Sequence, residues 1–226
     1  MPTASFSLDD IYLTSVERRT LASAVHPMLA VRGAPGTHDV NLGVELIERL
    51  KGDGDVTALP LLDKAVDDRK PPDQWPVFAG RPAVIIVEGW CLGAEAVPSA
   101  ELEPAINTLE KQQDAQGVWR NYVNEQLRRV YPRLFSLCDV WVMLAAPDWN
   151  LVYGWRLRQE TRLRDKCREQ GFDDSALMSP EAVATFIQHY ERITRRCLEQ
   201  IPARADFLLS LDEQLQIVRI SGIDEE

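Results

Sequence analysis

The run Ala83–Glu88, with the sequence AVIIVE, constrains the fold of this 226-residue chain more than any other segment. It is a continuous stretch of apolar, mostly β-branched side chains, which is typical of a strand buried on both faces of a parallel sheet. A second run of this kind covers Asp139–Ala145. Because helical patterns separate such strands, the sequence predicts an α/β fold, with a doubly wound, mostly parallel sheet and helices on both faces.

Shorter elements are expected around these two strands. Further strands are predicted at 5–10, 206–211 and 215–220, and helices at 14–25, 39–52, 101–114, 117–137, 148–170 and 180–200. Thr14 and Glu17 form a capping box for the first helix, Asp39 can cap the second, and Pro180 suits the first position of the last. The proline-rich stretch 52–82 admits no long element, and a connection of that length suggests a binding loop.

Composition and charge limit the function classes. A hydrophobic content of 45% is ample for a core, and one domain over 1–226 is expected. The formal net charge of −10 opposes binding to nucleic acid or to an anionic membrane. The apolar runs are too short to span a bilayer and no basic-then-apolar leader is present, so we predict a cytoplasmic protein without a membrane partner.

The cysteines indicate neither a zinc site nor a disulfide framework. They are far apart, form no CxxC pair and have no histidines nearby; they are Cys91, Cys138, Cys167 and Cys197. Reduced, mostly buried thiols are expected. The sequence leaves the oligomeric state open, and a homo-oligomer is among the forms that it allows.

Polar residues that follow the predicted strands are the natural candidates for a site. In open α/β sheets ligands bind at the carboxyl ends of the strands, and those positions hold Asp9 and Asp10, then Glu88, then Asp148. Each carboxylate alone would also fit a helix cap. Together, one acid could accept the proton of a substrate hydroxyl while a neighbouring acid holds Mg²⁺, which is the division of labour in phosphoryl transfer.

Several blocks of the sequence resemble the D-glycerate 3-kinases, which are relatives of uridine kinase and pantothenate kinase. The first are SLDDIYLT at 7–14, VHPMLAVRGAPGTHDV at 25–40, LDKAVDDR at 62–69 and VEGWCLG at 87–93. The others are WRNYVNEQL at 119–127, WRLRQETRLR at 155–164, FIQHYERIT at 186–194 and PARAD at 202–206. The resemblance covers nearly the whole chain, and it implies a P-loop kinase-like fold.

On the acceptor side, the resemblance implies a substrate site built from several of these blocks. Arg32 lies in the RGAPGTHD loop, where its guanidinium could form a bidentate contact with a substrate carboxylate. His38 is open to two interpretations, a substrate contact or hydrogen bonds that hold the loop. The other implied substrate-binding residues are Asp10, Tyr12, Asp39, Lys64 and Arg69. Lys64 and Arg69 would equally well tie the long loop to the acidic loops around it.

On the phosphoryl side, the resemblance implies roles for four residues. Asp9 matches the strand-end aspartate that acts as catalytic base, and Glu88 matches the acid that helps to place Mg²⁺. Arg156 and Arg162 fall where such kinases carry their lid, so they are candidates for neutralising the transferred phosphoryl group. The arginines of this region also fit a solvated helix face, because acids such as Glu160 are interleaved with them.

The phosphate-binding loop of the family is missing from the sequence. In the family a strand, a GxxxxGK(S/T) loop and a helix precede the SLDD strand, whereas here that strand begins four residues after Met1. GAPGTHD lacks the lysine, and KGDGD at 51–55 has acids where phosphate needs donors. The fold is therefore expected to lack its first strand, P-loop and first helix, with that strand's central place between the strands at 83 and 139 left unfilled.

The predicted function follows with its alternatives. The resemblance implies an ATP- and Mg²⁺-dependent kinase that converts D-glycerate to 3-phosphoglycerate, with weak ATP binding by this chain. Either the product starts roughly 30 residues upstream, the length of a strand–loop–helix unit, or a truncated relative closes the gap or pairs with another chain. There are two alternatives. The chain could belong to a kinase of another hydroxylated metabolite, or to a non-catalytic binding or regulatory protein.

Overall fold

A computed structural model describes residues 1–174 and 177–222 of the chain. They form two compact units, which are described separately. The first unit comprises Met1–Ala105 and Glu110–Asp139, and the second comprises Ile106–Leu109 and the residues from Val140 onward. A single domain over 1–226 therefore stays a prediction.

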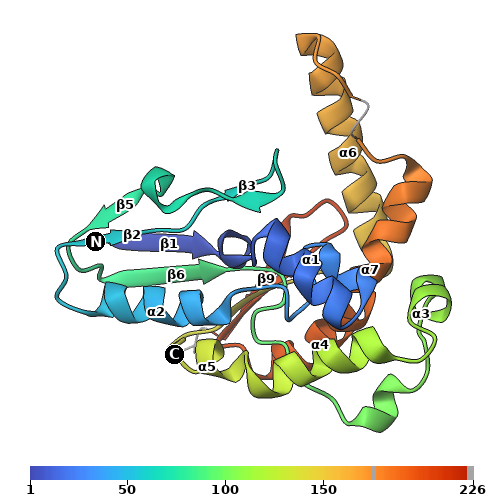
Figure 1. The fold of residues 1–226 in the computed structure, drawn as a ribbon, viewed down its shortest axis with the longest axis horizontal. Helices are drawn as coiled ribbons and strands as arrows, with labels where there is room; N and C mark the ends of the chain where they lie inside the picture. Colours follow the sequence, from blue (N-terminus) through green and yellow to red (C-terminus); the bar gives the residue numbers. More distant parts are fainter. Residues whose placement is uncertain (175–176, 223–226) are drawn as a thin grey trace. The chain divides into compact units, whose positions relative to one another are not determined.

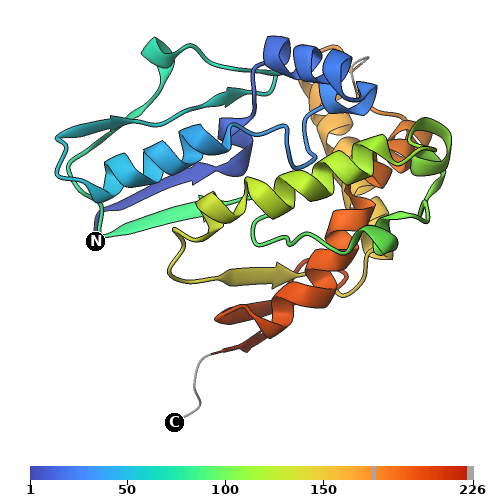
Figure 2. The ribbon, with the colours of Figure 1, turned by 60° about the horizontal axis from the view of Figure 1, so that its bottom comes forward.

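The first unit is organised around a pair of parallel strands, β1 (Thr3–Ser7) and β6 (Val84–Glu88). Their register places Thr3 opposite Val84 and Ser7 opposite Glu88, so both strands end at the same level. Helix α2 (Val40–Lys51) runs alongside the pair (Figures 1 and 2). A short 3₁₀ helix, η1 (Leu8–Ile11), follows β1 directly and carries the predicted acids Asp9 and Asp10.

Helices bury most of the core of the first unit. The apolar face of α2 is buried over Val40, Val44, Leu46, Ile47 and Leu50. The other helices of this unit are α1 (Ser15–Ala24), α4 (Val118–Arg129) and α5 (Pro132–Phe135), with 3₁₀ turns η2 (Pro27–Ala30) and η4 (Ser99–Leu102). The capping predictions are confirmed: Thr14 and Glu17 form the capping box of α1, and Asp39 caps α2.

The stretch 52–82 forms two small antiparallel pairs and one 3₁₀ turn. Strand β2 (Val56–Ala58) pairs with β5 (Val77–Ala79), and β3 (Leu62–Asp63) pairs with β4 (Asp68–Arg69). The turn η3 (Pro72–Gln74) lies between β4 and β5. As the prolines predicted, no long element forms here.

The second unit contains a three-stranded sheet and two long helices. Strand β7 (Val142–Ala145) pairs in parallel with β8 (Phe207–Leu211), which pairs antiparallel with β9 (Ile217–Ser221). Helices α6 (Asn150–Gln170) and α7 (Pro180–Gln200) contact each other, and the short 3₁₀ turn η5 (Ile201–Ala203) follows α7. Helix α3 (Thr108–Gln113) begins in the 106–109 segment of this unit and continues into the first unit. Among the helices formed by residues 1–174 and 177–222, none combines the length and apolarity that crossing a bilayer requires.

The α/β class with parallel strands is confirmed, but the expected burial of the two central strands is wrong. Ile86 of β6 is 49% exposed, and on β7 Val142 and Leu144 are 55% and 62% exposed. In the described part of the chain β6 pairs only with β1, and β7 only with β8, so each strand keeps one open edge. A strand with one neighbour is not covered as a central strand would be.

Two predicted helices are shorter than expected because prolines interrupt them. The segment 117–137 divides into α4 and α5, since Pro132 starts a new turn instead of continuing α4. The segment 101–114 yields only η4 and α3, with Pro104 between them. By contrast, α7 begins at Pro180 and ends at Gln200, as predicted.

Candidate active site at the ends of β1 and β6

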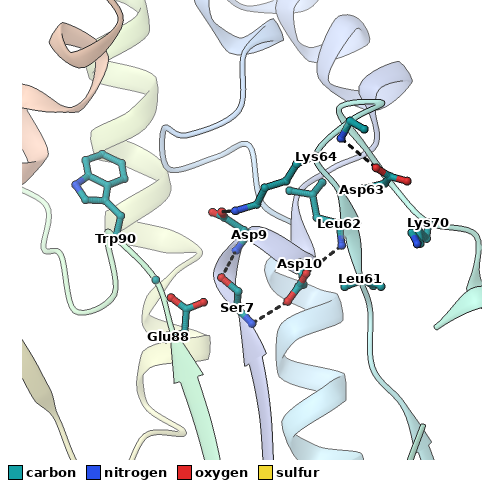
Figure 3. Close-up of a pocket in the computed structure, with 12 residues that line it drawn as sticks. Ser7, Asp9, Asp10, Leu61, Leu62, Asp63, Lys64, Lys70, Glu88 and Trp90 are labelled. Carbon is teal, nitrogen blue, oxygen red and sulfur yellow. Dashed lines mark hydrogen bonds and ion pairs between the residues drawn. The ribbon is translucent and has the colours of Figure 1, made fainter. Parts of the chain in front are cut away.

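An open pocket of about 780 Å³ lies in the first unit, at the carboxyl ends of β1 and β6 (Figure 3). The β3–β4 hairpin forms another wall. The lining residues are Ser7, Asp9, Asp10, Leu61, Leu62, Asp63, Lys64, Ala65, Lys70, Glu88, Gly89 and Trp90. The structure therefore brings together four predicted site residues: Asp9, Asp10, Lys64 and Glu88.

The serine at the end of β1 turns the chain so that Asp9 faces the pocket. Ser7 caps η1: its Oγ accepts a hydrogen bond from the amide of Asp9 (3.1 Å). The carboxylate of Asp9 makes one ion pair, with its Oδ2 3.3 Å from Nζ of Lys64. Since the Asp9 side chain is 41% exposed, it has room to meet a ligand.

Asp10 also lines the pocket, but it acts as a structural link. Its Oδ2 accepts the amide of Ser7 and its Oδ1 accepts the amide of Leu62, both at 3.0 Å. The first bond completes the capping box of η1, and the second fastens η1 to the β3–β4 hairpin. Both carboxylate oxygens thus already have partners, whereas a substrate-binding role was predicted from the sequence.

Glu88 reaches the same pocket from β6 because two backbones approach each other closely. Ser7 and Glu88 are register partners, and the carboxylate of Glu88 lies beside the Ser7–Asp9 turn (Figure 3). A Cβ on the next residue, Gly89, would lie 2.5 Å from Cβ of Leu8. Only glycine therefore allows the end of β6 to pass so near to η1.

These groups suit acid–base and metal chemistry. Two exposed carboxylates, Asp9 and Glu88, face one open space with a lysine at its edge. Carboxylate oxygens are suitable ligands for Mg²⁺, which usually keeps several waters and needs few protein ligands. No cluster of three or more candidate metal ligands occurs among the residues that the structure describes. Asp9 and Glu88 are the carboxylates that would hold such an ion, and Mg²⁺ binding stays a prediction.

The RGAPGTHD loop lies outside the lining of this pocket and is tightly packed. His38 is buried, stacks on Tyr12 with ring centroids 4.3 Å apart, and has its Nδ1 2.5 Å from the hydroxyl of Tyr131. The same hydroxyl accepts the amide of Gly36 (2.9 Å). Burial lowers the pKa of His38 to about 3, so the imidazole is neutral at physiological pH. Of the two interpretations of His38, the structure supports the one in which a hydrogen bond holds the loop. The partner is the side chain of Tyr131.

The charged residues of the loop region also have partners within the protein. The guanidinium of Arg32 pairs with Asp67 and lies 5.8 Å from the ring centroid of Tyr12. Asp39 accepts the amide of Leu42 as the α2 cap, and its other oxygen lies 3.6 Å from Nη1 of Arg69. Five predicted substrate-binding residues therefore make contacts within the first unit and stabilise it; they are Tyr12, Arg32, His38, Asp39 and Arg69. A direct contact between any of them and a ligand stays a prediction.

The two predicted lid arginines belong to α6 in the second unit. Arg156 pairs with the buried Glu160, donates to Gln159 at 2.8 Å, and lies 5.6 Å from the ring centroid of Phe186. Arg162 is exposed on the same helix. Arg156 and Glu160 form an i,i+4 ion pair, but it is not the solvated helix face of the alternative interpretation, because Glu160 is buried. A role for either arginine in phosphoryl transfer stays a prediction.

Sequence reasoning missed three polar pocket residues and one buried arginine. Ser7, Asp63 and Lys70 line the pocket, but only the hairpin pairing brings the last two there. For Asp63 and Lys70, the one signal in the sequence was that the LDKAVDDRK segment lies in a long polar loop. Arg18 is fully buried on α1 and binds backbone carbonyls, although nothing in the sequence distinguishes it from an exposed helix arginine.

Comparisons with known proteins agree with the sequence resemblance. The chain is 31% identical over 196 residues to the chloroplastic D-glycerate 3-kinase of Arabidopsis thaliana, covering 83% of this chain and 39% of that protein. It is 34% identical over 195 residues to an uncharacterized kinase of Schizosaccharomyces pombe, covering 82% of this chain and 66% of the relative. The chain thus spans 39% to 66% of the length of these relatives.

Solved structures give the same fold. The D-glycerate 3-kinase of Cryptococcus neoformans var. grubii superposes with a TM-score of 0.76, over 98% of this chain and 80% of that chain. The sequence identity of 23% makes this a likeness of fold. No protein-family model matches the sequence.

Proposed function

Because the chain belongs to the family of D-glycerate 3-kinase and related P-loop kinases, we propose that its pocket is the acceptor side of a small-molecule kinase site. The reaction is transfer of a phosphoryl group from ATP to D-glycerate, giving 3-phosphoglycerate. The observation that carries the proposal is the meeting of Asp9 and Glu88 in one pocket beside Lys64.

Each pocket side chain has a role suited to its chemistry. Asp9 accepts the proton of the attacking hydroxyl, since it is a carboxylate with room for a ligand. Glu88 holds Mg²⁺ directly or through water, and the ion, when bound, neutralises charge on the phosphate groups. Lys64 attracts the acceptor carboxylate away from the two acids. The pocket would otherwise repel an anion, because its lining holds four acids, Asp9, Asp10, Asp63 and Glu88, and only one other cation, Lys70.

The donor side needs groups that this sequence does not provide. The 226 residues contain no GxxxxGK(S/T) segment, and amides and a lysine of that kind hold the β- and γ-phosphates in P-loop kinases. We propose that this chain alone binds Mg-ATP weakly and that the phosphate contacts come from residues beyond these 226. Arg156 and Arg162 are the proposed cations for the transferred group.

An acceptor panel tests the substrate assignment. A polypeptide that carries this chain together with a GxxxxGK(S/T) segment from its own reading frame is assayed for ADP release with D-glycerate, L-glycerate, other hydroxy acids and uridine. D-glycerate is expected to give the highest kcat/KM. Turnover of another acceptor without turnover of D-glycerate would overturn the substrate but keep the kinase.

The second candidate is a non-catalytic binding or regulatory protein, and the missing phosphate-binding motif favours it. Calorimetry on the 226-residue chain separates the possibilities. Binding of D-glycerate with little binding of Mg-ATP fits both the proposed acceptor site and this candidate, and the turnover assay then distinguishes them. Micromolar affinity for Mg-ATP would contradict the proposal that the donor site is incomplete.

A further inference from the structure

The β3–β4 hairpin is a wall of the pocket that apolar packing does not hold in place. Of residues 61–70, only Leu62 is buried, and the turn residues Lys64, Ala65, Val66 and Asp67 are all exposed. Yet Lys64, in this exposed turn, meets Asp9 across the pocket at 3.3 Å. Polar contacts must therefore fix where the turn lies.

The strongest of these contacts comes from Arg18 on α1. Its side chain is 1% exposed, and its Nη2 donates to both the carbonyl and Oδ2 of Asp67, at 2.9 and 2.8 Å. Its other nitrogens donate to the carbonyls of Leu13 (2.6 Å) and Ala30 (3.2 Å). A planar guanidinium bonded in several directions within one unit has little freedom, so it offers the turn a rigid anchor.

Asp67 is fastened from a second side as well. Its Oδ1 pairs with the guanidinium of Arg32, which lies over the ring of Tyr12. Its backbone is left-handed, with φ of 55°, a conformation that aspartate tolerates better than most residues. Its carboxylate thus lies between two arginines that both belong to the body of the first unit.

We infer that Asp67, clamped between Arg18 and Arg32, is a positioning residue that places the hairpin turn so that Lys64 reaches Asp9. Other contacts hold the base of the hairpin: Asp10 accepts the amide of Leu62, and Asp68 accepts the amide of Ser15 (3.1 Å). Loss of the Asp67 carboxylate therefore loosens the turn, which keeps only the bond from Arg18 to the carbonyl of residue 67, while the strands stay attached.

The inference rests on the proposed function only for its catalytic consequence. In that function Lys64 lies beside the base Asp9, and when their exposed ion pair yields to the ligand, Lys64 binds the carboxylate of an anionic hydroxy acid whose hydroxyl faces Asp9. When the turn moves, the acceptor loses its cation and its orientation, which raises the KM for the acceptor more than it lowers kcat.

A carbodiimide cross-link measures the positioning without any enzymatic activity. The reagent joins the Lys64 amine to the Asp9 carboxylate with loss of water, and peptide mass spectrometry reports the yield. The pair Lys51–Asp139, 3.9 Å apart in the same unit, serves as the internal standard. The variant is Asp67→Gly, because glycine accepts a positive φ and so keeps the turn free of strain.

Asp67→Gly should lower the ratio of the 9–64 product to the 51–139 product about three- to tenfold, as loss of a partly screened, charge-assisted hydrogen bond implies. Asp73→Asn, which removes an exposed acid from the same loop, should leave the ratio unchanged. An unchanged ratio in Asp67→Gly would overturn the inference. If the ratio falls but the polypeptide that carries this chain with a GxxxxGK(S/T) segment turns over no acceptor, the positioning stands and the proposed function fails.

Discussion

The RGAPGTHD loop and the strand-end pocket carry most of the predicted site residues of the first unit, but their polar groups differ in availability. In the loop, His38 is buried and bonded to Tyr131, and Asp39 caps α2. In the pocket, Asp9 has a single, exposed partner and Glu88 is exposed. Residue type alone therefore does not identify a site, whereas polar atoms that are available to a ligand do.

The contrast has an energetic basis. Each buried polar atom of the loop would cost free energy if it lost its partner, so the loop is committed to one structure. The Asp9–Lys64 pair is exposed and screened by water, so it contributes little to stability and can yield to a ligand. Substitutions should therefore affect activity in the pocket and stability in the loop.

The largest expected effect is on catalysis. Asp9→Asn in the polypeptide that carries this chain with a GxxxxGK(S/T) segment should lower kcat by about 10²- to 10⁴-fold, the usual contribution of a general base. The free energy of unfolding should change by less than about 1 kcal/mol, because the ion pair is exposed. Steady-state kinetics and urea denaturation measure the two quantities. A variant that is unstable but fully active would break the comparison.

Tyr131→Phe should show the opposite behaviour. It leaves Nδ1 of His38 and the amide of Gly36 without their partner in a buried place, which should destabilise the first unit by about 2–4 kcal/mol. Urea denaturation measures the loss, and calorimetry should find acceptor affinity unchanged in the folded protein. Tyr122→Phe, on the same unit and half-buried, is the matched control and should cost less.

Gly89→Ala should affect both stability and acceptor binding, because Gly89 lines the pocket and also packs against η1. The new Cβ would lie 2.5 Å from Cβ of Leu8, so β6 and η1 must move apart. Overpacking of this kind costs about 1–3 kcal/mol, and the shift should also weaken acceptor binding because it separates Glu88 from Asp9. Thermal melting and calorimetry test both effects. Wild-type values in both would mean that the close approach does not shape the pocket.

The smallest effect is a pH dependence that belongs to the loop. The pKa of His38 falls from 6.5 to about 3 on folding because the ring is buried, so the unfolded chain binds the extra proton between these pH values. Stability should fall as the pH decreases below 6.5, by about 1 kcal/mol between pH 7 and 5.5. Urea denaturation at both pH values measures this. His38→Asn should remove that part of the dependence, and an equal dependence in the variant would contradict it.

Local signals in the sequence predicted where helices begin better than they predicted how deeply strands are buried. The caps at Thr14 and Asp39 and the start of α7 at Pro180 follow from neighbouring residues, and the structure has them. The burial of β6 was not predictable from AVIIVE, since it depends on how many strands and helices cover that strand. Pro132 did signal the break between α4 and α5, but the periodicity on either side of it obscured the signal.

The same limit applies to the site. Asp9 and Glu88 were found because Glu88 ends β6 and Asp9 lies two residues beyond the end of its parallel neighbour β1, at the sheet edge where α/β folds bind ligands. Lys70 and Asp63 reach the pocket only through hairpin pairing within an irregular loop, which the sequence does not encode by any periodicity. Whether a histidine or arginine is buried and satisfied, as His38 and Arg18 are, depends on tertiary contacts.

In the proposed function, acceptors bind where Asp9, Lys64 and Glu88 meet. Titrating the isotope-labelled 226-residue chain with D-glycerate and following its backbone amide signals by NMR tests this most directly. We expect the largest shifts at residues 9, 64, 89 and 90, with small shifts at 32–39. Shifts concentrated at 32–39, with none at the strand ends, would contradict it.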